Sequence, residues 1–130
     1  MKTNRKDKQL LTPLELKAMN ILWNLKKAFV KDIIKQWPEG ENLPKYNTVS
    51  TIIRILETKG YVGHESEGRS HRYFPLVNKG QYQKKLVRNV LDNVFSGSLT
   101  GMVSSLLDSQ KVSSKDIDAL KDILEDSEDK

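Results

Sequence analysis

Cysteine is absent from this 130-residue chain, and long apolar runs are absent as well. Without cysteine the chain has no disulfide, no thiolate metal ligand and no Cys nucleophile, which fits a reducing compartment. No run approaches the roughly 18 apolar residues of a membrane span, and the start, MKTNRKDKQLL, lacks the apolar stretch of a signal peptide. We therefore expect a cytoplasmic protein that does not insert into a membrane.

Short catalytic motifs are also missing. The sequence contains no Walker loop, no GxSxG elbow and no HExxH pair, and its carboxylates are spread over faces that we expect to be exposed. Its two histidines, His64 and His71, flank a turn without an arranged carboxylate, so they do not predict a metal site. We expect a protein that is not an enzyme and uses no cofactor.

Positive charge is concentrated in the first part of the chain. The formal net charge is +5, but residues 1–77 hold 14 Lys and Arg against 8 Asp and Glu, a balance of +6. Residues 78–130 hold 8 against 9, a balance of −1. A polyanion is therefore a plausible partner of the first part only. Residues 1–11 are largely polar and basic, and we expect them to form a flexible arm.

Three helices are predicted between residues 12 and 60. The first begins at LTPLELKAMNILW, where Thr12 is a candidate N-cap, Pro13 suits the first helical position and Glu15 completes a capping box. A second, shorter helix is predicted in FVKDIIKQW and is closed by Pro38. The third is YNTVSTIIRILET, which ends before Gly60 and has a buried stripe with helical spacing: Val49, Ile52, Ile53 and Leu56.

A β-hairpin is predicted after Gly60. In YVGHESEGRSHRYFPLV, two strand-like runs flank a turn centred on Gly68. Tyr61 is expected to cover the core, together with either the pair Tyr73 and Leu76 or the pair Phe74 and Val77, depending on register. Three helices followed by a hairpin is the order of a winged helix-turn-helix, which we assign to residues 12–77.

The polar face of the third helix has the side chains expected of a helix that reads DNA. Asn can pair with adenine and Arg with guanine through two hydrogen bonds, while hydroxyls can reach bases or phosphates. Residues of its first turn are better placed for phosphates, and cations on the hairpin suit phosphates beside the groove. The DNA-binding candidates are Lys45, Tyr46, Asn47, Thr48, Ser50, Thr51 and Arg54 on the helix, and Arg69, His71 and Arg72 on the hairpin.

Residues 78–130 are predicted to form three short amphipathic helices, the last capped by Ser113 with Asp116. Helices of this size make a poor independent core, so they need a partner, and a second copy of the same chain is the simplest one. The candidate dimerisation residues are Leu86, Val90, Leu91, Val94, Leu99, Met102, Val103, Leu106, Leu107, Leu120 and Leu124. The predicted fold is mainly α with a small β-wing, followed by a helical dimerisation region.

The sequence resembles the penicillinase repressor family (BlaI, MecI and CopY) over nearly the whole chain from Leu11. The resemblance is carried by LTPLELKAMNILW, by NTVSTIIRILETKGYV and by RYFPLV, in this order and at the family's spacing. It implies a winged-helix transcriptional repressor that forms a homodimer through its C-terminal helices. Such a dimer binds dyad-symmetric operators in double-stranded DNA, and the β-lactam-responsive members control antibiotic resistance.

The resemblance also implies a route of relief, namely cleavage in the C-terminal region by a membrane sensor-protease. Where β-lactam-responsive relatives have an Asn-Phe scissile pair, this chain aligns Ser105 and Leu106, which form the candidate cleavage site. The copper-responsive branch uses a C-terminal Cys cluster, so the absence of cysteine excludes copper sensing of that kind.

Two other functions remain open at this point. A winged helix can dock a protein instead of DNA, but that use favours an apolar recognition face, and this one is polar. A repressor can also be released by a small ligand between the winged helix and the tail, which requires an apolar pocket with convergent polar groups.

Overall fold

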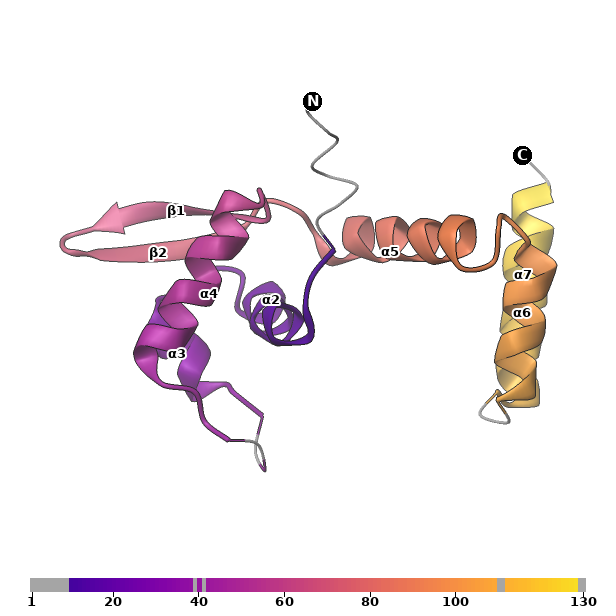
Figure 1. The fold of residues 1–130 in the computed structure, drawn as a ribbon, viewed down its shortest axis with the longest axis horizontal. Coiled ribbons are helices and arrows are strands. Elements are labelled where there is room, and N and C mark those ends of the chain that lie inside the picture. The colour runs from indigo at the N-terminus through magenta and orange to yellow at the C-terminus, as the bar shows by residue number, and fades with distance from the viewer. Residues whose placement is uncertain (1–9, 39, 41, 110–111, 129–130) are drawn as a thin grey trace. The chain divides into compact units, whose positions relative to one another are not determined.

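The computed structural model describes residues 10–38, 40, 42–109 and 112–128, with side chains described as far as Asp122. The chain divides into two compact units, the first ending at Leu86 and the second beginning at Val87. The elements are α2 (Pro13–Leu25), α3 (Val30–Lys35), α4 (Tyr46–Thr58), β1 (Val62–Glu67), β2 (Ser70–Pro75), α5 (Lys79–Asn93), α6 (Leu99–Asp108) and α7 (Ser114–Glu128) (Figure 1). The predicted class, mainly α with a small β-wing, is confirmed; the domain boundaries after residues 11 and 77 stay a prediction.

The first helix, α2, begins as the sequence predicts. The Glu15 backbone N–H donates to Thr12 Oγ1 at 3.2 Å, and the Thr12 backbone N–H donates to Glu15 Oε1 at 3.0 Å. This reciprocal capping box satisfies two backbone donors that the helix itself leaves unpaired. Because the helix start is fixed, Ala18, Met19 and Leu22 fall on the face that enters the core.

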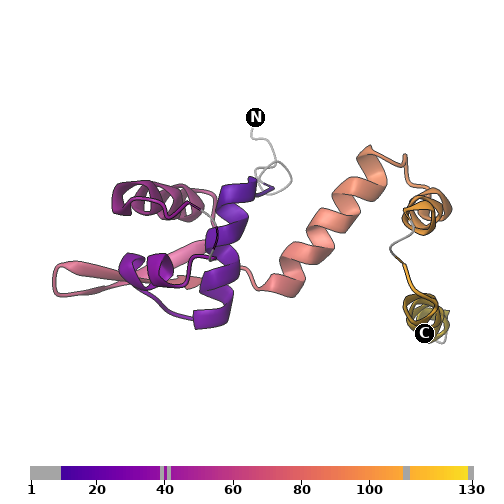
Figure 2. The same cartoon turned by 90° about the horizontal axis from the view of Figure 1, so that it is seen from below.

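The third helix of the unit, α4, packs against both α2 and α3. Its four predicted core residues are all buried, and Val49, Ile53 and Leu56 are fully so. Each such side chain contributes about 1.5–3 kcal/mol by leaving water, so the stripe fixes the rotation of α4 about its own axis. The opposite side of the helix therefore faces away from the core. Both ribbon views show α4 together with the hairpin on one side of α2 (Figures 1 and 2).

The hairpin pairs β1 with β2 in antiparallel register, from Val62 opposite Pro75 to Glu67 opposite Ser70. Gly68 and Arg69 form the two-residue turn, and Gly68 has a φ of +62° that suits glycine. The other edge of β2 is tied to the helices, since Ala28 and Tyr73 exchange backbone hydrogen bonds of 2.9 and 2.8 Å. The hairpin is thus held at its base and carries Arg69 at its tip.

The inward side of the hairpin differs from both predicted alternatives. Tyr73 is buried, but Leu76 is 58% exposed, and Val77 packs against the core instead. The two residues of each predicted pair lie three positions apart, and an odd spacing puts them on opposite sides of an extended backbone. Tyr73 and Val77 lie four positions apart and so fall on one side. A hydrogen bond of 2.7 Å from the Leu76 backbone N–H to the Tyr61 carbonyl marks the end of the hairpin.

The first turn of α5 belongs to the first unit through Tyr82. Its ring lies 5.8 Å from the Tyr61 ring and 6.1 Å from the Trp23 ring, measured between centroids. Its hydroxyl accepts a hydrogen bond from the Leu11 backbone N–H at 3.0 Å. Tyr82 therefore packs against the core and links the start of the first unit to α5 at its end.

In the second unit, Ser98 caps α6 by accepting from the Gly101 backbone N–H, and Ser113 with Asp116 forms the predicted cap of α7. The helix α6 buries none of its residues within the single chain. Leu99, Leu106 and Leu107 are 45–54% exposed. In the part of the chain that the structure describes, no helix is long and apolar enough to cross a membrane.

Candidate nucleic-acid interface

The outer face of α4 presents a row of polar side chains. With about 100° of rotation per residue, Asn47, Thr51 and Arg54 share one narrow face opposite the buried stripe, and all three are exposed. Within the described residues, Arg54 makes no ion pair, so its guanidinium is available to a ligand. These three residues form what we call the α4 face.

The other four helix candidates lie around this face. Tyr46, 56% exposed, and the half-buried Ser50 flank it on the side of the hairpin, whereas Thr48 flanks it on the other side. Lys45 is the N-cap residue of α4 and is exposed. Sequence reasoning placed all four on the helix, but it did not separate the two flanks.

The three hairpin candidates have different surroundings. Arg72 Nε lies 3.3 Å from Glu67 Oε2, and its guanidinium lies 5.0 Å from the centroid of the Phe29 ring. Its charge is therefore partly compensated within the fold. Arg69 and His71 instead line a cleft beside α4. The roles of all the predicted DNA-binding residues stay predictions.

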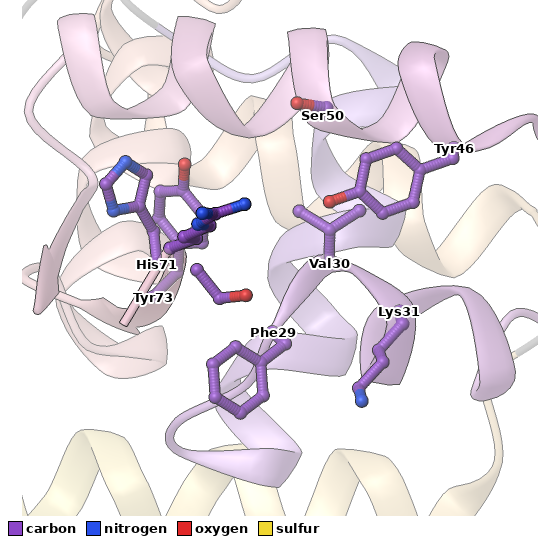
Figure 3. Close-up of a pocket in the computed structure, with 9 residues that line it drawn as sticks. Phe29, Val30, Lys31, Tyr46, Ser50, His71 and Tyr73 are labelled. Atoms are coloured by element: carbon purple, nitrogen blue, oxygen red, sulfur yellow. The ribbon is translucent and has the colours of Figure 1, made fainter. Parts of the chain in front are cut away.

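This cleft has a volume of about 240 Å³ and lies between the start of α3, the first half of α4 and the beginning of β2 (Figure 3). We call it the α4–wing cleft. Figure 3 shows the Tyr46 hydroxyl directed toward the side of the cleft formed by His71 and Tyr73, with Val30 between them. The residues that line it are Phe29, Val30, Lys31, Tyr46, Ser50, Arg69, Ser70, His71 and Tyr73.

Lys31 and Ser70 are the polar members of this lining that sequence reasoning missed. Lys31 lies in the first turn of α3, a helix that the pattern marked only by its buried residues. Its ammonium lies 5.8 Å from the centroid of the Phe29 ring. The available signal for Lys31 was its position, a polar residue at the start of the helix that precedes the predicted DNA-reading helix. This signal is weak without the tertiary structure.

An ion pair fixes the C-terminal end of α4 to the start of α2. Lys59 Nζ lies 2.7 Å from Glu15 Oε1, and their side chains are 20% and 8% exposed. Burial alone raises the pKa of Glu15, but hydrogen bonds from Lys59 and Thr12 and the Lys59 charge outweigh it, so the pKa lies below its ordinary value. Glu15 therefore stays ionised and holds α4 at a fixed angle to α2.

Two further pairs fix the hairpin. His64 Nδ1 lies 2.7 Å from Glu57 Oε2 on α4, and Lys27 Nζ lies 3.3 Å from Glu65 Oε2. At the residue before β1, burial, followed by the neighbouring Tyr82 and Glu15, raises the pKa of Tyr61 to about 12. The hairpin is thus anchored to α4 and to the loop after α2, which sets the distance between the α4 face and the hairpin tip.

The described residues contain no group of three or more His, Asp or Glu side chains that could hold a metal ion. The arrangement offers hydrogen-bond donors and positive charge instead. Three helices with a β-wing, an exposed polar helix face and a cationic hairpin tip define a winged helix-turn-helix of the DNA-binding class.

The profile described as penicillinase repressor matches residues 11–126, and the chain belongs to this family, whose members are DNA-binding transcriptional repressors. The chain is 27% identical over 117 residues to the penicillinase repressor of Bacillus licheniformis, covering 89% of this chain and 90% of that protein. It is 26% identical over 115 residues to the methicillin resistance regulatory protein MecI of Mammaliicoccus sciuri, covering 88% and 92%. The solution structure of the DNA-binding domain of the repressor BlaI matches with a TM-score of 0.48 and 25% identity, covering 55% of this chain and 87% of that one.

Proposed function

We propose that this chain acts as a homodimeric repressor that binds a dyad-symmetric operator, with α4 in the major groove and the hairpin on the adjoining backbone. The observation that carries the proposal is the division of α4 into a fully buried stripe and an exposed polar face whose Arg54 has no described carboxylate partner. Family membership supports the same use of the helix.

The contacts follow from the chemistry of the side chains. Asn47 and Arg54 lie on the α4 face, where amide and guanidinium groups can each make two hydrogen bonds to a base edge. Thr51 lies between them and can reach a base or a phosphate. Lys45 and Tyr46 begin the helix, so we assign them to phosphates.

Dimerisation is proposed for the second unit because its helices leave apolar side chains uncovered. Leu99, Leu106 and Leu107 are about half exposed, and Val94 is 68% exposed. Exposed apolar groups at helical spacing gain by packing against an identical surface in a symmetric dimer. Val90, Leu91, Met102, Val103 and Leu120 are half-buried candidates, Leu86 also packs against the first unit's core, and the side chain of Leu124 lies outside the described residues.

The dimer supplies most of the affinity in this proposal. Two recognition helices about 34 Å apart, or a multiple of that distance, read two half-sites of one operator. Because the second contact is intramolecular once the first has formed, losing the dimer weakens binding by orders of magnitude without changing any DNA-contacting residue. Cleavage in the C-terminal region is therefore a sufficient switch.

Ser105 and Leu106 are the proposed cleavage site, and a membrane sensor-protease is the proposed partner. Both residues lie in α6 and are exposed. A protease needs the chain extended, so cleavage requires local unfolding of this helix, which buries none of its residues within the single chain. The family relationship supports this route of relief.

The test is selection of bound fragments from the source genome by the purified chain, followed by footprinting at two salt concentrations. We expect one protected inverted repeat at a promoter, with weaker protection at the higher salt concentration. Diffuse binding without a dyad would contradict the operator. Binding that does not depend on salt would favour the docking of a protein by the same helix.

A further inference from the structure

The α4–wing cleft is lined by hydrogen-bond donors and contains no carboxylate. Hydroxyl groups come from Tyr46, Ser50 and Ser70, and positive charge comes from Lys31 and Arg69. These groups belong to three separate parts of the fold, α3, α4 and the hairpin, which surround one space. The residue types fit an anion and offer little to a cation.

The two cations of the cleft differ in their ion pairs from two other cations of the first unit. Lys27, in the loop after α2, and Arg72, on β2, each have a carboxylate at 3.3 Å. Lys31 and Arg69 have no carboxylate partner among the residues that the structure describes, and both are exposed at the cleft. Two positive charges beside one cleft without a carboxylate partner favour the binding of an anion there.

The volume of the cleft restricts the size of that anion. Sites for drug-sized ligands occupy about 300–1,000 Å³, whereas this cleft has about 240 Å³. The cleft is also partly open to solvent, and Figure 3 shows Lys31 at its margin. A tetrahedral phosphate with part of its ester groups fits such a space, and hydroxyls with a guanidinium are the donors that phosphates favour.

We propose that the α4–wing cleft is a phosphate-binding site in which Lys31 and Arg69 jointly hold one phosphate group. In the repressor it takes one backbone phosphodiester per half-site; a free phosphate ester offers the same chemistry and is the other source. The first assignment rests on the proposed function. Because α4 and the hairpin both line the cleft, one phosphate there sets how deeply the α4 face enters the groove.

The number of phosphates held can be read from the salt dependence of operator binding. The slope of log K against log salt changes by about 0.9 for each phosphate that the protein ceases to neutralise. The full-length chain with both Lys31→Gln and Arg69→Gln is compared with the unsubstituted chain by fluorescence anisotropy on its operator. If the two cations share one phosphate, the slope falls by about 0.9 per half-site, or about 1.8 for a dyad.

A fall of about 3.6 in the dyad slope would show two independent phosphates and would overturn the shared site, as would an unchanged slope. Lys84→Gln is the matched control, since it removes one exposed charge from α5 outside the cleft and should leave the slope almost unchanged. Circular dichroism confirms that each variant is folded.

A second measurement separates the two sources and does not need DNA binding. Amide spectra of the full-length chain are recorded with inorganic phosphate and with chloride at equal ionic strength. Saturable shifts at Ser70 and His71, absent from the double variant, would support the site with free phosphate as a ligand. Shifts that appear only with operator would support the backbone phosphodiester. No shift with either would overturn the site, whereas a chain that binds no DNA but shifts with phosphate would contradict only the proposed function.

Discussion

The ion pair between Glu15 and Lys59 should make a measurable contribution to stability, and Glu15→Gln tests it. Glutamine at this position can still accept the hydrogen bond from the Thr12 backbone, so the capping box is retained and the negative charge of the pair is removed. Breaking a buried pair by removing one partner costs about 3–5 kcal/mol. Lys59 is 20% exposed and can turn toward water, so we expect a smaller effect, about 1–3 kcal/mol.

The free energy of unfolding is measured by urea titration at pH 7. Glu65→Gln is the control because it breaks the exposed pair with Lys27, whose side chains are 49% and 51% exposed. Such pairs contribute at most about 1 kcal/mol. If Glu15→Gln costs no more than Glu65→Gln, the pair does not fix α4 to α2, and our account of the interface geometry is wrong.

The lowered pKa of Glu15 also predicts how the contribution of the ion pair to the free energy of unfolding depends on pH. Folding lowers the pKa of Glu15 below its ordinary value of 4.5, so the unfolded chain takes up this proton first as the pH falls. The stabilisation is therefore complete above pH 4.5 and disappears as the pH falls through the folded-state pKa. The difference between the unsubstituted chain and Glu15→Gln should shrink over that window. A difference that stays constant on acidification would contradict a lowered pKa.

The remaining predictions concern the operator, the dimer and the closure of the core. Arg54→Ala should cost about 1–3 kcal/mol on the preferred operator and relax the base preference at one position, measured by anisotropy on single-base variants; an unchanged profile would show that Arg54 does not read a base. Leu107→Asp should give a monomer in sedimentation velocity, because it places a charge on the exposed apolar surface of α6, and a stable folded dimer would move the interface elsewhere. Tyr82→Phe should lower the free energy of unfolding by about 0.5–1.5 kcal/mol because the hydrogen bond from Leu11 is removed, and a change near zero in urea titration would mean that water replaces the hydroxyl.

Features that depend on neighbouring residues were predictable from the sequence. The capping box of Thr12 and Glu15 spans three residues, and the buried stripe of α4 spans two turns, so helix geometry alone determines them. The hairpin turn at Gly68 is equally local. What sequence reasoning missed joins distant segments: Glu15 and Lys59 are 44 residues apart, and Ala28 and Tyr73 pair across three elements.

Only part of the candidate surface could be predicted from the sequence. Helical spacing grouped Asn47, Ser50, Thr51, Arg54 and Thr58 on one face; four of them are exposed, whereas Ser50 is half-buried and lines the cleft. Arg69 and Arg72 were grouped as equivalent hairpin cations, whereas the register brings only Arg72 within reach of Glu67. The cleft was not predictable because its lining comes from α3, α4 and β2, and no local pattern relates Lys31 to Arg69.

The ion pairs also limit how much of the salt dependence of operator binding the α4 face and the α4–wing cleft can explain. In the described part of the first unit, Lys27, Lys59 and Arg72 hold the fold together through carboxylates. The cations left around the α4 face and the cleft are Lys31, Lys45, Arg54 and Arg69. Even if each of the four neutralised its own phosphate, a dimer would hold about eight phosphates and have a slope of at most about −7.

If Lys31 and Arg69 share one phosphate, as we propose, that limit falls to about −5. A measured slope steeper than about −7 therefore requires positive charge from outside this surface. The basic arm predicted at residues 1–11, with Lys2, Arg5, Lys6 and Lys8, is the largest group of such charges in the sequence before the winged helix. Deleting residues 2–8 should then reduce the slope while leaving the footprint in place. An unchanged slope would exclude the arm from the complex and would direct attention to Lys35 on α3 and Lys79 on α5, which are exposed and not counted above.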